Sequence, residues 1–167
     1  MLTKDDLLNS MIHECNVIKH LAAKVPSGRL DWRPTPGQRS ILETLRYLSF
    51  CAAGAVHMLI EGNWDWYQKA GAASKTLPFD SIERAMDDQI AELRKLFESI
   101  PHKDFVEKQV TLPDGSVVSL GRGILDSAHK WLTGYKMQLF LFEKEAGNDK
   151  IGTWNCWRGK DKVEQPA

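Results

Sequence analysis

The sequence predicts an all-α fold, a four-helix bundle with a small β-hairpin between the third and fourth helices. Two observations predict it: apolar residues recur at steps of three and four over four long segments, and capping or helix-breaking sequences bound each segment. Each such helix must bury one apolar stripe, which a four-helix bundle achieves. The chain has 167 residues, 43% of them hydrophobic, so we expect one domain over residues 1–159 and a flexible tail over residues 160–167.

The first predicted helix begins after Thr3, which can cap it, with Asp6 in the acidic position of a capping box. Its apolar stripe continues to about Lys24. Residues 25–39 then contain several prolines, which disfavour helix, so we expect an ordered loop there.

The second predicted helix begins with another capping-box pattern, formed by Ser40 and Glu43. Its apolar stripe runs to about Leu59. Residues 64–73 follow as a short helical insertion that starts with the aromatic residues Trp64, Trp66 and Tyr67. Rings of this size need cover, so they are expected to be buried against the bundle or to face a partner.

The third predicted helix starts at a cap made by Asp80 with Glu83 and ends before Pro101. Beyond it, the sequence Pro-Asp-Gly lies between two short β-prone runs, residues 109–112 and 116–119. This pattern predicts a hairpin.

The fourth predicted helix spans Leu125 to Gly147, where glycine can take the left-handed conformation that ends a helix. Its inward stripe consists of Leu125, Ala128, Trp131, Leu132, Tyr135, Leu139 and Phe142. The segment from Ile151 to Gly159 is too aromatic for a free tail, so we expect it to pack on the helices.

The composition limits the function classes. Lys plus Arg and Asp plus Glu both number 22, so no net charge would attract nucleic acid or an anionic membrane surface. No apolar run is long enough to span a bilayer, and the first residues lack the pattern of a signal peptide. The cysteines Cys15, Cys51 and Cys156 lack the spacing of a disulfide framework or a zinc knuckle. We therefore expect a soluble, cytoplasmic protein.

Two stretches resemble a known superfamily. Residues 29–50, RLDWRPTPGQRSILETLRYLSF, resemble the first loop and second helix of the DinB/YfiT-like four-helix bundles, in which a Ser-Ile-x-Glu helix start follows a proline-containing loop. Residues 131–147, WLTGYKMQLFLFEKEAG, resemble the last helix of these proteins, with Gln138 in the place of a recurrent glutamine.

The resemblance implies a metal position that this sequence has lost. Members with assigned activities bind a divalent metal through one histidine on helix two and two on helix four, and several transfer or isomerise small thiols. Tyr47, Trp131 and Tyr135 stand at these positions here. Indole offers only an N–H donor and a neutral phenol is a poor ligand, so we expect no metal and no cofactor.

The same position yields the candidate ligand-binding site, Tyr47, Trp131 and Tyr135, to which we add His20 and Glu43. Core packing by the three rings is the favoured interpretation, and an aromatic-lined ligand pocket is the alternative. For Glu43, a helix cap is favoured over a catalytic base.

Three other candidate sites are weaker. A relocated metal site would need histidines that converge, but His13 and His20 lie about 10 Å apart along one helix, and His129 points away from the inward stripe. Cys156 beside Arg158 could be a nucleophile, although a packed cysteine is favoured. The loop arginines could bind an anion, although solvated charges are the simpler interpretation; they are Arg29, Arg33 and Arg39.

Two functions remain open. The first is a metal-free DinB-like module that binds a small molecule or a protein partner, with a second copy of the chain as one candidate partner. The second is a metal-dependent thiol S-transferase or hydrolase whose ligands the pattern does not reveal. The missing histidines favour the first.

Overall fold

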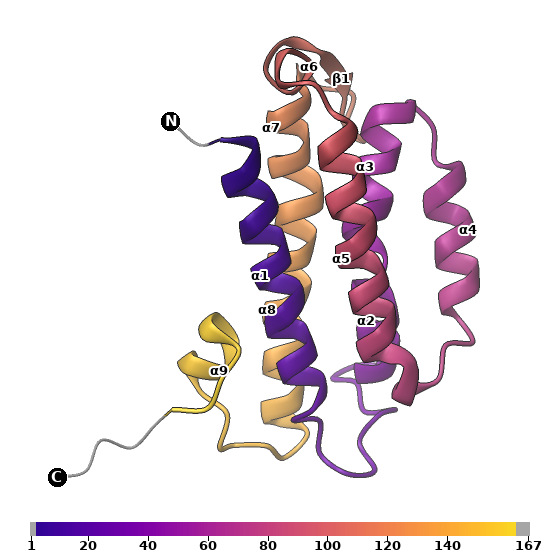
Figure 1. Ribbon diagram of the computed structural model, residues 1–167. Helices are drawn as coiled ribbons and strands as arrows, with labels where there is room; N and C mark the ends of the chain where they lie inside the picture. The colour runs from indigo at the N-terminus through magenta and orange to yellow at the C-terminus, as the bar shows by residue number, and fades with distance from the viewer. Residues whose placement is uncertain (1–2, 163–167) are drawn as a thin grey trace, which may run out of the picture.

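The computed structural model describes residues 3–162, which are mostly helical with one small two-stranded antiparallel sheet (Figure 1). The helices are α1 (Lys4–Ala22), α2 (Ile41–Leu48), α3 (Cys51–Glu61), α4 (Asp65–Ser74), α5 (Ile82–Ser99), α6 (His102–Glu107), α7 (Leu120–Ile124), α8 (Lys130–Glu145) and α9 (Thr153–Arg158). A 3₁₀ turn, η1 (Phe79–Ser81), precedes α5, and a π turn, η2 (Leu125–His129), joins α7 to α8. The strands are β1 (Gln109–Thr111) and β2 (Val117–Ser119).

The long helices lie side by side around one apolar core (Figure 1). Helix α1 packs against α5, α8 and α9, while α3 packs against α4, α5 and the segment formed by α7 and η2. Helix α4 lies at the edge of the molecule and contains no fully buried residue. The hairpin and α6 lie together at one end.

Two of the three predicted helix caps are confirmed. Thr3 and Ser40 each accept a hydrogen bond from the backbone three residues on, and Asp6 and Glu43 accept one in return. The cap predicted at Asp80 is wrong: η1 leads directly into α5, and no side chain caps that helix.

The second predicted helix is interrupted. Instead of running unbroken to Leu59, it stops at Leu48, and α3 begins at Cys51. Gln89 of α5, 3% exposed, fills the break. Its Oε1 accepts from the amides of Ala52 and Ala53 at 3.0 and 3.3 Å, and its Nε2 donates to the carbonyl of Leu48 at 2.9 Å. The amide thus satisfies backbone groups that an unbroken helix would have paired internally.

The last helix begins earlier than predicted, at Leu120 rather than Leu125, and continues through η2 into α8. Gly121 and Gly123 obscure this start, because glycine lowers helix propensity. Close packing explains them: a Cβ at Gly121 would lie 2.8 Å from the Phe105 ring. The predicted end is confirmed, since Gly147 has a φ of +118° just after α8.

The predicted hairpin is confirmed. Val110 pairs with Val118 at the centre of the ladder, and the Ser116 carbonyl accepts from the Leu112 amide at 2.8 Å to close the turn. The sequence did not predict α6. This helix is a single short segment after Pro101 that buries only Phe105, so it carries no repeating apolar stripe.

The segment after α8 packs on the helices, as predicted, because α9 contacts α1 and α8 and buries Asn155 and Cys156. Of the tail predicted to be flexible, residues 160–162 are described. There the Asp161 carboxylate accepts from Lys24 Nζ at 2.7 Å. Residues 163–167 lie outside the described residues. Across the described helices, none has the length and apolar character that a membrane crossing requires.

Replacing Gln89 should destabilise the fold. Gln89→Met keeps the length of the side chain but leaves two buried N–H groups and one carbonyl without their partner. We expect the free energy of unfolding to fall by about 3 kcal/mol or more, because three buried polar groups lose their partner and each unpaired group costs roughly 1 to 3 kcal/mol. Urea unfolding followed by circular dichroism measures this change.

Gln68→Ala is the matched control, because Gln68 is exposed on α4 and should change the stability by no more than about 0.5 kcal/mol. Equal effects of the two substitutions would contradict the role assigned to Gln89.

Candidate functional site

Three of the five predicted site residues lie together. Tyr47 of α2 and Tyr135 of α8 pack with ring centroids 4.6 Å apart, and Trp131 is one turn from Tyr135 on α8. Tyr67 of α4 completes the group: its ring is 6.0 Å from Trp131, and its hydroxyl is 3.3 Å from the Tyr47 hydroxyl. Helices far apart in the sequence therefore place their rings at one position.

The sequence did not identify Phe50 and Tyr67 as members of this cluster. Phe50 stands at the break between α2 and α3, and its ring lies 5.2 Å from Tyr67 and 5.7 Å from Tyr47. Tyr67 can approach because Gly54 of α3 has no side chain; a Cβ there would lie 2.7 Å from the Tyr67 ring. The aromatic run at the start of α4 indicated that Tyr67 needs cover, but the sequence does not show where its ring points, because that depends on how α4 packs.

The cluster does not offer the donors that a divalent metal needs. Burial raises the pKa of both Tyr47 and Tyr67, which keeps the phenols neutral at pH 7. Trp131 has an indole N–H and no lone pair for coordination. Across residues 3–162, no three His, Cys, Asp or Glu side chains come close enough to hold a metal ion.

A cleft of about 420 Å³ lies beside the cluster. Arg33, Arg39, Glu43, Tyr47, Phe50 and Lys75 line it, together with loop residues 36–38 and two small residues of α4. The guanidinium carbon of Arg39 lies 4.3 Å from the centroid of the Tyr47 ring and 5.3 Å from that of Tyr135. These distances are typical of cation–π contacts.

Glu43 has a structural role in this cleft. One of its carboxylate oxygens accepts from the Ser40 amide at 2.8 Å and lies 3.2 Å from Arg33 Nη2. The cap interpretation of Glu43 is thus supported by direct contacts. The carboxylate also offsets part of the charge of Arg33, whereas Arg39 and Lys75 have no acidic partner within residues 3–162.

His20 lies apart from the cluster. Its Nε2 is 3.0 Å from Asn155 Nδ2 and 3.9 Å from the Asp161 carboxylate, at the contact between α1 and α9. Burial lowers the pKa of this imidazole. His20 was predicted to line the ligand site because it precedes the first loop in the sequence. That prediction is wrong, because its ring contacts Asn155 and Asp161 of the C-terminal segment.

The other histidines near α1 are also tied to separate partners. His129 lies 2.8 Å from the hydroxyl of Ser10, so it faces α1, and burial lowers its pKa. His13 Nε2 lies 2.8 Å from the carbonyl oxygen of Trp157 on α9. Each imidazole therefore has one structural partner.

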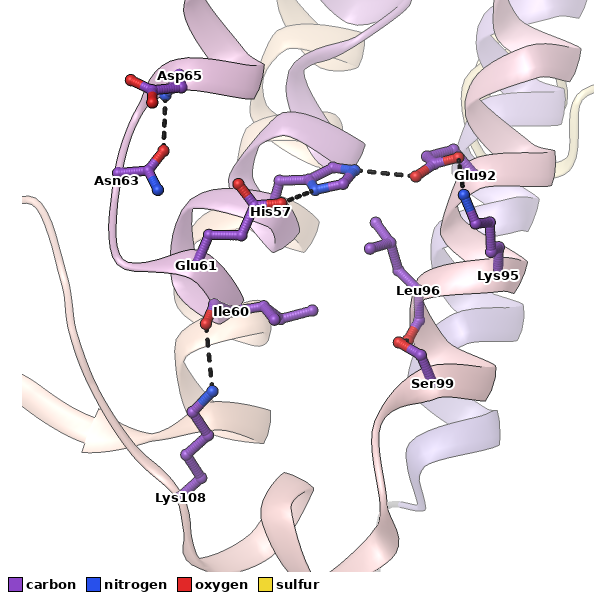
Figure 2. A network of polar contacts seen from close by, with 10 residues as sticks. All are labelled: His57, Ile60, Glu61, Asn63, Asp65, Glu92, Lys95, Leu96, Ser99 and Lys108. Carbon is purple, nitrogen blue, oxygen red and sulfur yellow. Dashed lines mark hydrogen bonds and ion pairs between the residues drawn. The ribbon is translucent and has the colours of Figure 1, made fainter.

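His57 of α3 differs, because both ring nitrogens meet carboxylates (Figure 2). Nδ1 lies 2.6 Å from Glu61 and Nε2 lies 2.9 Å from Glu92 of α5. The imidazole also stacks on the Trp66 indole at 4.5 Å with an interplanar angle of 13°. The spacing of His57 and Glu61 in the sequence allows their pairing, but only the fold brings Glu92 and Trp66 to the same ring.

Two ionisable side chains of α8, Lys136 and Glu143, are fully buried. Lys136 of α8 is fully buried, with its ammonium 2.7 Å from the Glu14 carboxylate of α1 and 4.3 Å from the Trp157 ring centroid. Glu143 is also fully buried, and neither of its side-chain oxygens has a hydrogen-bond partner. Burial raises the pKa of Glu143 to about 9, so this carboxyl is neutral at pH 7.

The burial of the three cysteines argues against a nucleophilic role. Cys15, Cys51 and Cys156 are free thiols, and all three are buried. Burial raises the pKa of Cys15 to about 12 and raises those of Cys51 and Cys156 as well. A nucleophilic cysteine needs the opposite shift, so the geometry supports Cys156 as a packed residue.

No family model matches the chain, and no curated protein matches it. The resemblance to DinB-like proteins therefore rests on the residues quoted for it. The chemistry of the site must be argued from its own side chains.

The pKa of Glu143 should make the stability depend on pH. Between pH 5 and pH 8 the native carboxyl keeps its proton while the unfolded one loses it, so the free energy of unfolding falls as the pH rises. Glu143→Gln removes this contribution. The difference in the free energy of unfolding, variant minus wild type, should therefore increase by about 1.4 kcal/mol per pH unit in this range. Urea unfolding of both proteins at several pH values measures this difference.

Glu145→Gln is the control, because Glu145 is exposed two residues away. A difference between the Glu143→Gln variant and the wild type that does not change with pH would contradict the buried, neutral state of Glu143.

Proposed function

We propose that this chain is a DinB-like four-helix bundle that binds a small organic anion, without a metal, in the cleft lined by Arg33, Arg39 and Lys75, which we call the anion cleft. The order and packing of the helices support the fold: α1, α2 with α3, α5, and α7 with α8 provide the long segments, and the hairpin precedes the last one. The break at Ser49 and Phe50 leaves α2 and α3 as successive parts of one segment.

Arg39 is the observation that carries the proposal. Its guanidinium carbon lies 4.3 Å from the centroid of the Tyr47 ring and 5.3 Å from that of Tyr135, and its side chain makes no hydrogen bond or ion pair to another residue within 3–162. Its N–H donors are therefore available to a ligand. A guanidinium held against aromatic rings and without another partner can bind a carboxylate or phosphate group through two parallel N–H donors.

The other cleft residues favour the same ligand class. Lys75 adds a second uncompensated cation, and the pair of Arg33 with Glu43 is close to neutral. Tyr47 and Phe50 offer apolar contact to the body of the ligand. The volume of about 420 Å³ lies within the range of roughly 300 to 1,000 Å³ that small-molecule sites occupy.

The aromatic cluster supports a function that does not use the superfamily's metal. Tyr47, Trp131 and Tyr135 fill that position with groups that are poor ligands at pH 7. Metal-dependent thiol transfer would need a donor set that these side chains do not supply. Self-association through the half-exposed Trp154 and Trp157 of α9 stays a prediction.

Replacing Arg39 tests the proposal. Benzoate and inorganic phosphate, titrated separately into ¹⁵N-labelled protein, should shift the amide signals of the first loop and the start of α2. Arg39→Gln should lower the affinity for the anion at least tenfold, since it removes a charge-assisted donor pair worth roughly 1.5 to 3 kcal/mol. Arg29→Gln is the matched control, because Arg29 is an exposed loop arginine that does not line the cleft.

Two outcomes would overturn the proposal. One is an equal loss of affinity in the Arg29→Gln and Arg39→Gln variants, or no binding of either anion to the wild type. The other is stoichiometric Zn, Ni, Fe or Mn in protein purified without a metal-affinity tag, lost on His20→Ala or His57→Ala.

A further inference from the structure

A second cleft, of about 370 Å³, lies between α4 and α5. We propose that this cleft binds an organic ammonium ion with a small aromatic or apolar body, and we call it the ammonium cleft. The inference does not depend on the proposed function, because it uses a different cleft with the opposite charge.

The walls of the ammonium cleft are largely apolar. Phe50, Trp66 and Leu77 contribute the large side chains, and alanines of α4 and α5 leave the space between them. Aromatic faces attract an ammonium group through their negative electron density, most strongly for indole. The walls therefore suit both the apolar body and the charged end of such a ligand.

The charged residues that line this cleft are all acidic. Asp88 and Glu92 stand one turn apart on α5, and the lining contains no Lys, Arg or His. Asp88 makes no ion pair or hydrogen bond through its side chain within residues 3–162. Two cations outside the lining contact residues of the wall: Arg46 donates to the carbonyl of Leu77 at 2.8 Å, and Lys95 Nζ lies 3.8 Å from Glu92 Oε2.

The network around His57 holds Glu92 in place (Figure 2), and a ring stack with the same imidazole holds Trp66. Its Nε2 bonds Glu92 at 2.9 Å, and its ring stacks on the indole of Trp66 at 4.5 Å. Glu61 fixes the other ring nitrogen at 2.6 Å. The carboxylate and the indole are therefore positioned before any ligand arrives, which lowers the entropic cost of binding.

Gln89 also lines the cleft, but its side-chain amide is already hydrogen-bonded to the backbone at the break between α2 and α3. Glu92 is paired through both carboxylate oxygens, with His57 and Lys95, so Asp88 is the acidic group of the wall that has no side-chain partner within residues 3–162. Its carboxylate accepts hydrogen bonds and carries a negative charge, so it favours a cationic donor over a neutral or anionic group.

Phe50 separates the ammonium cleft from the anion cleft. Its ring and Ser74 line both clefts, and a Cβ at Gly71 would lie 3.3 Å from the Phe50 ring. The ring thus packs closely against α4 between the two clefts. Arg39 and Lys75 line only the anion cleft, so the acidic end of the ammonium cleft has no basic residue in its own wall.

The test uses a charged probe and its neutral counterpart. Phenethylammonium chloride, titrated into ¹⁵N-labelled protein at neutral pH, should shift amide signals of α4 and of α5 around Asp88. Phenethyl alcohol, which has nearly the same shape without the charge, should bind at least fivefold more weakly. Asp88→Asn should lower the affinity for the ammonium at least threefold without changing that for the alcohol.

Two variants make the test specific. Ala73→Leu fills the space beside α4 and should abolish binding of both probes. Asp87→Asn removes the same charge one residue away, where the carboxylate contacts Lys19 at 2.6 Å, and should leave binding unchanged. Equal binding of ammonium and alcohol, equal effects of Asp87→Asn and Asp88→Asn, or no shift with the ammonium would each overturn the inference.

Discussion

The hydrogen bonds from Gln89 to the interrupted helix are the interaction on which the rest of the structure depends. They allow the chain to leave regular helix at Ser49 and Phe50 while the backbone of Leu48, Ala52 and Ala53 stays paired. They also join α5 to α2 and α3 through a buried polar contact, which specifies the register of these helices more strictly than apolar packing does. Phe50 is left free to turn its ring towards α4.

The ring of Phe50 links this interruption to the functional surfaces. On one side it meets the aromatic cluster of Tyr47 and Tyr67, over which Arg39 lies. On the other side it forms a wall of the ammonium cleft with Trp66. Two clefts of opposite charge thus adjoin one aromatic side chain, although the chain as a whole has no net charge. Local charge separation, and not the overall balance, determines what each cleft can bind.

The sequence predicted the elements whose signals are local. The stripes of α1 and α5, the caps at Thr3 and Ser40, and the hairpin turn all depend on residues a few positions apart. The helix break was not predictable in this way, since Gln89 lies 37 residues from Ala52 and 41 from Leu48. The site shows the same limit: helical spacing placed Trp131 and Tyr135 on one face, but the contribution of Tyr67 from α4 and the position of His20 beside α9 depend on tertiary packing.

Helix α4 forms a wall of both clefts, yet none of its residues is fully buried. Its attachment to α3 relies on partly buried rings, with Trp66 stacked on His57 and Tyr67 packed over Gly54. An element that buries so little apolar surface has a low free energy of local opening compared with the helices of the core. Its amides should therefore exchange with solvent faster than those of α5, and a ligand held in either cleft would slow that exchange by binding the closed form.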